Sequence, residues 1–275
     1  MFTEMNSTTE YNLTMGTSVS NFMHLKPDPR TKDWFLVDNP TYPVAIVLLY
    51  LVFCFSTESI MKDRPAVNLR WLFVTYYAVC VLLSIYISIE ILIHGFPTLY
   101  NAFCPAITPA YQNSPSGMRV CSAVWVFYMT KYLKLFDTVP LMLQRKFDRI
   151  NSYHIYHHCS MTLMIWFHVK YYVDGPDVLG ILLNSLFHIL VYGYYGMNAF
   201  GPSMRKYLWW KKYIIKMHMV EFWTIILTDM YYAIINCNNK GWVHLGVVID
   251  VCLLTVMILA VGHPSSTADP KEKHD

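Results

Sequence analysis

The chain has 275 residues, of which 55% are hydrophobic, 16% are aromatic and only 14% are charged. An ordinary soluble domain carries about 25% charged residues, so this composition indicates a protein that is solvated largely by lipid. The formal net charge of +3 is too small to predict a nucleic-acid partner, and none is expected. The first 20 residues lack a basic stretch followed by an apolar core, so no cleavable signal peptide is predicted.

Seven apolar stretches follow one another, each near the roughly 20 residues that a helix needs to cross a bilayer. The first is the shortest, the connecting segments are mostly short, and no internal repeat is evident, which favours a single helical bundle. The sequence therefore predicts an all-α integral membrane protein with an N-terminal tail over 1–40, a seven-helix domain over 41–262 and a C-terminal tail over 263–275. The predicted helices cover 41–56, 69–93, 120–143, 153–173, 178–200, 213–235 and 243–261.

Lysine and arginine gather in alternate connections, after the first, third and fifth helices, and such loops are typically cytoplasmic. This pattern predicts a lumenal N-terminus and a cytosolic C-terminus. Glycosylation acceptors at Asn6 and Asn12 fall in the tail that this orientation places in the lumen. Lys271 and Lys273 resemble a dilysine retrieval signal, with a solvated charged tail as the alternative. Together these features predict a multi-pass protein of the endoplasmic reticulum membrane.

The seven cysteines form no Cys-x-x-Cys pair, and five of them lie in apolar stretches where a free thiol packs as a small hydrophobic group. Cys104 and Cys237 instead lie in polar connections that the predicted orientation puts in the lumen. A disulfide and two unpaired thiols are both open for this pair.

Three histidines lie in or beside the fourth apolar stretch. His154, His157 and His158 have the spacing i, i+3 and i+4, which places them on one face of a helix. Ionisable groups inside a membrane cost a few kcal/mol or more, and they usually mark a functional site. The third stretch carries more such residues in a similar setting, so the pattern favours a membrane enzyme; they are Lys131, Lys134, Asp137 and Thr138.

These motifs, in their order along the chain, resemble those of the very-long-chain fatty acid elongases, the ELO family of membrane condensing enzymes. The resemblance rests on residues 61–65, 131–138, 154–158 and 184–195. It implies that six helices form a barrel-like bundle around an acyl tunnel and that one helix is peripheral. It also implies a 3-oxoacyl-CoA synthase that joins long-chain acyl-CoA to malonyl-CoA and releases CO2 and CoA. No cofactor or metal is expected. Ketoacyl-CoA reductase, dehydratase and enoyl-CoA reductase are the expected partners, and a homodimer is left open.

The resemblance selects the site residues, and chemistry suggests their roles. A neutral imidazole can accept an acyl group or move a proton near pH 7, so His157 is expected to accept the acyl group and His188 to steer decarboxylation or stabilise the enolate. The residues expected to orient them are His154, His158, Asp137 and Asn184. The candidate substrate-binding residues are Lys131, Thr138, Arg145, Lys146, Tyr192, Tyr195, Lys211 and Lys212. Basic groups recognise the phosphates of CoA, although those near the loops also serve to fix orientation.

Two motif positions depart from the pattern of the elongases. Lys134 stands where a glutamate is typical, and the sixth helix has His218 and Glu221 where two glutamines are typical. One hypothesis is that Lys134 and Glu221 form a direct buried pair, since a lone buried lysine is costly. The alternative is that Lys134 extends into a wet cavity.

Two other classes share some of these features. Membrane desaturases and hydroxylases also contain an HxxHH box, but they bind a di-iron centre with several such boxes, whereas this chain has one. Receptors share the seven helices, the glycosylated tail and a motif like Asp148-Arg149-Ile150. A transporter is disfavoured because no repeat is seen. The receptor and the metal-dependent desaturase or hydroxylase stay as alternatives.

Overall fold

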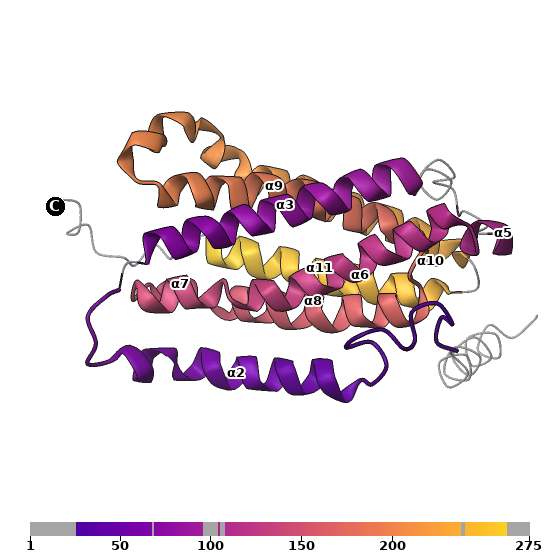
Figure 1. Cartoon of the computed structure of the whole chain (residues 1–275), viewed down its shortest axis with the longest axis horizontal. Coiled ribbons are helices and arrows are strands. Elements are labelled where there is room, and N and C mark those ends of the chain that lie inside the picture. The colour runs from indigo at the N-terminus through magenta and orange to yellow at the C-terminus, as the bar shows by residue number, and fades with distance from the viewer. Residues whose placement is uncertain (1–25, 68, 96–103, 105–107, 238–239, 263–275) are drawn as a thin grey trace, which may run out of the picture.

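The computed structural model describes residues 26–67, 69–95, 104, 108–237 and 240–262. These residues form helices and connecting turns, with no strand among them (Figure 1). The long helices, of 20 to 25 residues each, are α2 Thr41–Met61, α3 Arg70–His94, α6 Pro115–Leu135, α8 Ser152–Tyr171, α9 Val178–Ala199, α10 Ile214–Ile234 and α11 Gly241–Gly262. The short ones are α5 Pro109–Gln112, α7 Thr138–Leu143, η1 Phe147–Arg149, η2 Pro202–Tyr207 and η3 Trp209–Tyr213.

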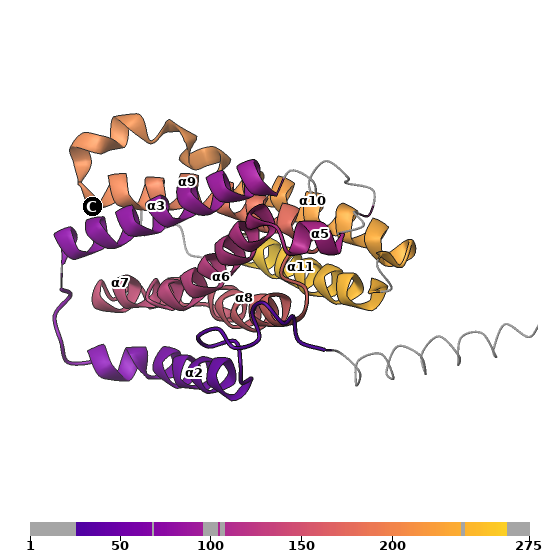
Figure 2. The ribbon, with the colours of Figure 1, turned by 45° about the vertical axis from the view of Figure 1, so that its right-hand side comes forward.

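The long helices run side by side along the long axis of the molecule (Figures 1 and 2). Their contacts follow a closed order, from α3 to α6, α8, α11, α10 and α9, and back to α3. Helix α2 lies at the edge of this group, where it packs on α8 and α7. Six helices therefore share an interior, and α2 is peripheral to it.

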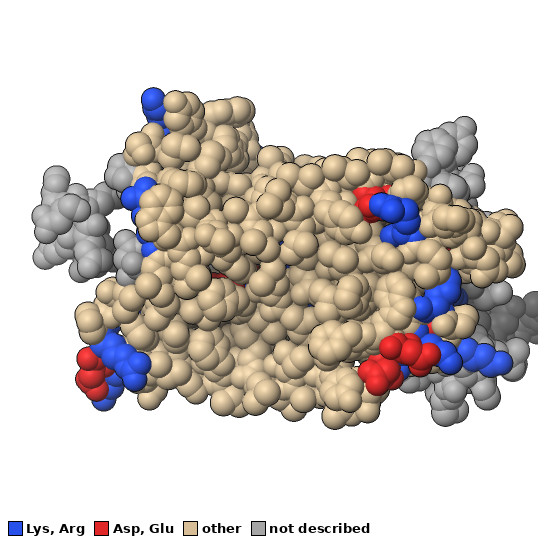
Figure 3. Space-filling view, in the orientation of Figure 1, with Lys and Arg blue, Asp and Glu red and all other residues tan. Residues whose placement is uncertain are grey.

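The surface between the two ends of the molecule is almost free of charge in the view of Figure 3, whereas lysine, arginine and acidic side chains gather at both ends. Large apolar side chains such as Phe55, Leu49 and Ile234 are 70% or more exposed. Within the described residues, α2, α3, α9 and α11 are long and apolar enough to cross a bilayer. An exposed apolar band between two charged ends is the surface that a membrane protein presents to lipid.

Several helix boundaries differ from those that the sequence predicted, among them the start of α6 at Pro115, five residues before the predicted start. The predicted helix over 120–143 is broken, because α6 ends at Leu135 and α7 starts at Thr138. Pro140 has no amide hydrogen to donate to the carbonyl four residues earlier, and the chain tightens there into turns in which Asp137 N donates to Lys134 O at 2.9 Å. The first helix is longer than predicted and continues through Thr57, whose hydroxyl donates to the Cys54 carbonyl at 2.8 Å.

Residues 26–40, predicted as part of a tail, pack on the bundle instead. The Thr31 hydroxyl donates to the Val169 carbonyl at 2.6 Å, and Val37 is fully buried. Arg30 forms ion pairs with Asp28 and with Asp174, the latter at 2.8 Å. This segment therefore closes one end of the bundle, and the predicted sites at Asn6, Asn12, Lys271 and Lys273 lie outside the described residues.

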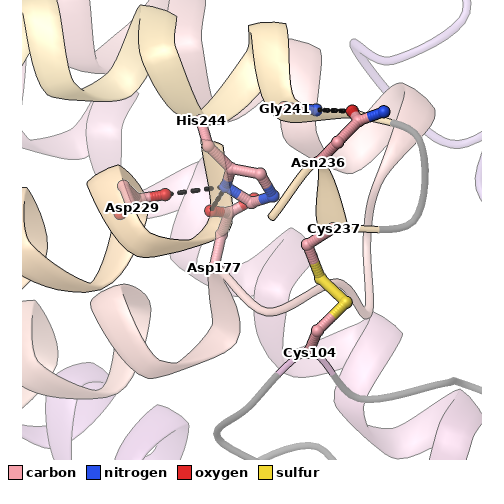
Figure 4. Close-up of a disulfide and its surroundings, with 7 residues drawn as sticks. All are labelled: Cys104, Asp177, Asp229, Asn236, Cys237, Gly241 and His244. Atoms are coloured by element: carbon pink, nitrogen blue, oxygen red, sulfur yellow. Dashed lines mark hydrogen bonds and ion pairs between the residues drawn. A yellow bond between two sulfur atoms is a disulfide. The ribbon is translucent and has the colours of Figure 1, made fainter. Parts of the chain in front are cut away.

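Cys104 and Cys237 form a disulfide at this same end, with their Cα atoms 5.6 Å apart (Figure 4). We call it the disulfide end. The opposite end carries α7 and the basic segments 145–149 and 205–212, and we call it the basic end (Figure 1).

Candidate active site

A cavity of about 940 Å³ extends from the basic end into the interior of the helix bundle. A second, narrow cavity of about 60 Å³ continues toward the disulfide end, and His157 and Met161 line both. Of the predicted site residues, the larger cavity is lined by Lys131, Asp137, Lys146, His154, His157, His158, His188, Tyr192 and Tyr195. Asn184 lines the narrow one. The structure thus brings most of the predicted site to one chamber.

The three histidines lie in the first two turns of helix α8, which begins at Ser152. The Asn151 side chain accepts a hydrogen bond from the His154 amide at 2.9 Å and caps the helix. The i, i+3 and i+4 spacing then stacks the rings on one face, with the His154 and His158 centroids 4.5 Å apart and those of His157 and His158 5.8 Å apart.

The three imidazoles have different partners. His154 Nε2 shares a hydrogen bond with the Thr138 hydroxyl at 2.9 Å, and His158 Nε2 lies 4.0 Å from a carboxylate oxygen of Asp137. His157 stacks on the Tyr153 ring, with centroids 5.7 Å apart, and its Nδ1 is buried without a hydrogen-bond partner. Of the three histidines, His157 is therefore the one with a fully buried ring nitrogen that has no hydrogen-bond partner.

Asp137 lies at the break between α6 and α7, where its carboxylate is held from two sides. The Tyr76 hydroxyl donates to Oδ1 at 2.8 Å and the Tyr192 hydroxyl donates to Oδ2 at 2.6 Å. These bonds link α3 and α9 to the carboxylate beside His158.

The two buried lysines of α6 each bond to α9. Lys134 Nζ and His188 Nδ1 share a hydrogen bond of 2.7 Å, in which a charged lysine is the donor, and Lys131 Nζ donates to Asn184 Oδ1 at 3.1 Å. Asn184 in turn donates through Nδ2 to Glu221 Oε1 at 2.7 Å. The hypothesis of a direct Lys134–Glu221 pair is therefore wrong, because each side chain has another partner. The alternative, in which Lys134 lines a cavity, agrees with its place in the chamber wall.

The sequence did not assign His218 and Tyr153 to the site, yet both line the chamber. His218 Nδ1 lies 3.5 Å from Glu221 Oε2, and its Nε2 shares a hydrogen bond with the Tyr153 hydroxyl at 3.1 Å. A polar path thus leads from Glu221 to the ring on which His157 stacks. The i, i+3 spacing of His218 and Glu221 on an apolar helix was the signal for this pair.

The predicted basic residues separate into two groups. Lys146 lines the chamber, together with Arg70 and Arg149, which were not assigned to the site from sequence. Arg145, Lys211 and Lys212 do not line it, and Arg145 donates to the Arg64 carbonyl at 3.0 Å. Thr138 is fully buried behind His154.

The site and the fold define a helical membrane protein with a histidine-lined chamber between its helices. The profile of the ELO: GNS1/SUR4 family matches residues 35–261. The chain is 32% identical to very long chain fatty acid elongase 4 of Mus musculus, over 79% of this chain and 69% of that protein. It is also 32% identical to very long chain fatty acid elongase 7 of Rattus norvegicus, over 84% of this chain and 83% of the relative.

The chain therefore belongs to the GNS1/SUR4 family of ELO proteins. The match covers the full set of long helices except the last residue of α11, so the chamber lies entirely within the shared region. The protein is a membrane protein of fatty acid elongation.

Proposed function

We propose that this protein catalyses the condensing step of elongation, joining long-chain acyl-CoA and malonyl-CoA to give 3-oxoacyl-CoA, CO2 and CoA. The single observation that carries the proposal is the position of His157, which lines both cavities and has a buried ring nitrogen without a hydrogen-bond partner. An imidazole that is not held by other bonds is free to react with a substrate carbonyl.

The two cavities suit the two parts of an acyl-CoA. Arg70, Lys146 and Arg149 at the mouth of the chamber supply cationic donors for the phosphates of CoA. The narrow cavity follows α8 from His157 to His168, which are 11 residues apart and so about 16 Å apart at 1.5 Å per residue. We propose that the acyl chain occupies this second cavity and that its carbonyl lies beside His157.

In the first half-reaction, one ring nitrogen of His157 attacks the thioester carbonyl as the C–S bond breaks. The proton that the other ring nitrogen gives up goes to the CoA sulfur, and CoA leaves as a thiol. The acyl group is then bonded to the imidazole. His154, His158 and Asp137 orient the box through Thr138 and the tyrosine hydroxyls of the chamber.

In the second half-reaction, malonyl-CoA loses CO2, and the enolate that remains attacks the acyl carbon as the bond to His157 breaks. The freed imidazole takes up a proton from water. The enolate oxygen needs a hydrogen-bond donor. Lys134 donates to His188 Nδ1, so the hydrogen of a neutral His188 ring is on Nε2, and we propose that this N–H stabilises the enolate. Side chains of this protein supply the nucleophile and the hydrogen-bond donor, and the proposed mechanism uses no cofactor.

We also propose a cellular location and a membrane orientation, which follow from membership of the elongase family. All seven long helices cross the membrane of the endoplasmic reticulum, six of them around the acyl tunnel, with the disulfide end lumenal and the basic end cytosolic. Glycans on Asn6 and Asn12 and a retrieval signal at Lys271 and Lys273 fit this orientation. Ketoacyl-CoA reductase, dehydratase and enoyl-CoA reductase would then complete the cycle.

The test is an elongation assay on membranes that contain the full chain, with labelled malonyl-CoA and acyl-CoAs of graded length. The wild type is expected to form products two carbons longer, and His157→Ala to form none. His94→Ala is the matched control, since it removes one imidazole at the disulfide end and should leave the products unchanged. Absence of product from folded wild-type protein with every acceptor would refute the proposal.

A further inference from the structure

A second polar cluster is buried at the disulfide end, remote from the histidine box. Asp177 precedes α9, Asp229 belongs to α10 and His244 belongs to α11, and the two carboxylates point toward the same imidazole (Figure 4). His244 Nδ1 lies 2.8 Å from Asp229 Oδ1 and 3.3 Å from Asp177 Oδ1. Their ligand atoms all lie within 4.8 Å of one another, and among the described residues no other group of three or more His, Cys, Asp or Glu converges in this way.

The cluster has more acceptors than donors. His244 Nδ1 carries at most one hydrogen, and this hydrogen bonds to Asp229, so Asp177 Oδ1 is buried without a hydrogen-bond partner. Two carboxylates that face one nitrogen also repel each other, and a buried carboxylate oxygen without a hydrogen bond is costly. A cation between the three groups would satisfy both oxygens and the nitrogen lone pair at once.

The spacing suits a small divalent cation. Zinc binds nitrogen and oxygen ligands at about 2.0–2.2 Å, which separates two ligand atoms of a tetrahedral site by about 3.3–3.5 Å. The 3.3 Å distance between His244 and Asp177 already has this value, and the 2.8 Å distance to Asp229 needs to open by only about 0.6 Å. Imidazole with carboxylates is a ligand set that selects zinc over calcium or magnesium.

His168 provides a second, independent observation. It is 4% exposed, its Nδ1 faces the Met164 carbonyl at 2.8 Å, and its Nε2 lies 3.0 Å from Asp177 Oδ2 without a hydrogen bond of good geometry. This imidazole is aimed at the carboxylate oxygen that does not face His244. A histidine paired with a ligating carboxylate is the usual outer partner of a metal ligand, and it orients that ligand.

The surrounding chain holds the three groups in place. The turn between α10 and α11 contains Cys237, whose disulfide to Cys104 lies beside the cluster, and Asn236, whose side chain accepts from the Gly241 amide at 2.9 Å (Figure 4). Two of the three groups are therefore on a hairpin that is cross-linked at its turn. Asp177 retains 15% of its side-chain surface, so the cluster is not fully enclosed.

We propose that Asp177, Asp229 and His244 form a zinc-type divalent-cation site that ties α9 to the hairpin of α10 and α11, with His168 as a positioning residue for Asp177. The three groups leave one ligand position of a tetrahedral ion open, and it would be filled by water. This role is structural and does not depend on the proposed condensation. It concerns residues other than the histidine box.

The test uses the full chain, purified without a polyhistidine tag, stripped with a chelator, incubated with zinc and analysed for metal content. The wild type is expected to retain about one zinc per chain. Asp229→Asn and His244→Gln are expected to lose it, and His168→Ala to bind it about 10–100-fold more weakly. His94→Gln is the matched control, because it removes a histidine from the same end of the molecule and should retain the metal.

A second measurement separates a metal site from an ion-pair cluster. Zinc should raise the melting temperature of the stripped wild type and should not affect Asp177→Asn, whose partly exposed side chain makes it the mildest of the substitutions. Cobalt in place of zinc should give the visible absorption of a tetrahedral site in the wild type alone. Zinc content that is negligible in the wild type, or unchanged in Asp229→Asn and His244→Gln, would overturn the proposal. So would metal lost only in His157→Gln, since the ion would then belong to the histidine box.

Discussion

Lys134 and His188 are joined across the α6–α9 interface by a hydrogen bond of 2.7 Å from Nζ to Nδ1. An ammonium group has no lone pair, so it can only donate, and the imidazole nitrogen that it meets must accept. This single contact fixes the tautomer of His188 and leaves its Nε2 as a donor. It also gives a role to a lysine at a position where the elongase pattern has a glutamate.

Replacing Lys134 by methionine should therefore impair catalysis in the protein that remains folded. A charge-assisted hydrogen bond contributes about 1.5–3 kcal/mol, so its loss should lower the condensation rate by about tenfold to a hundredfold. The measurement is kcat with saturating acyl-CoA and malonyl-CoA, beside the melting temperature of the same preparation. Lys134→Arg retains a cationic donor and should keep more activity than Lys134→Met. Equal activity in the methionine variant and the wild type would show that the contact does not matter for the reaction.

The two histidines should separate the two half-reactions. With acyl-CoA alone, the wild type should release free CoA in an amount equal to the enzyme, because His157 keeps the acyl group. His188→Ala should still show this release but should form little 3-oxoacyl-CoA when malonyl-CoA is added. His157→Ala should release none. Rapid measurement of free thiol, with mass spectrometry of the acylated protein, distinguishes these outcomes, and acylation that persists in His157→Ala would move the nucleophile to another residue.

Glu221 and Lys134 should be coupled although they do not touch. The ionisable groups at the centre of the site are Lys131, Lys134 and Glu221, which are buried, and Asp137, which is half-buried, so two can carry each sign. Either Lys134→Met or Glu221→Gln leaves one charge without compensation, which costs about 3–5 kcal/mol when a buried pair is broken. The double variant restores neutrality, so its loss of thermal stability should be smaller than the sum of the two single losses by about 1–3 kcal/mol. Strictly additive losses would mean that the two charges do not sense each other.

The sequence was sufficient to predict the features that depend on local residue spacing, namely the long helices and the face on which the histidines lie. Helical spacing placed His154, His157 and His158 on one face, and the apolar stretches located the long helices. It could not show that α6 stops before Asp137, because the competition between continued helix and a Pro140 turn depends on Tyr76 and Tyr192, which reach the carboxylate from other helices.

The sequence also could not predict which buried polar side chains form hydrogen bonds with one another. Lys134 and Glu221 are each within reach of several polar groups, and only the packing of α9 between them decides that Lys134 bonds to His188 and Glu221 to Asn184. The same holds for Arg70, whose position at the start of α3 has no local signal for the chamber that it lines.

The disulfide should stabilise the protein without taking part in the reaction. It joins residues 133 positions apart, and removal of a disulfide typically costs 2–4 kcal/mol. Cys104→Ser/Cys237→Ser should therefore melt at a lower temperature, while the initial elongation rate at low temperature stays close to that of the wild type, because the histidine box is at the other end of α8. Cys252→Ser, which removes an exposed free thiol, is the control and should melt as the wild type does. An elongation rate that falls in the double-serine variant before any loss of folded protein would instead connect the disulfide end to the active chamber.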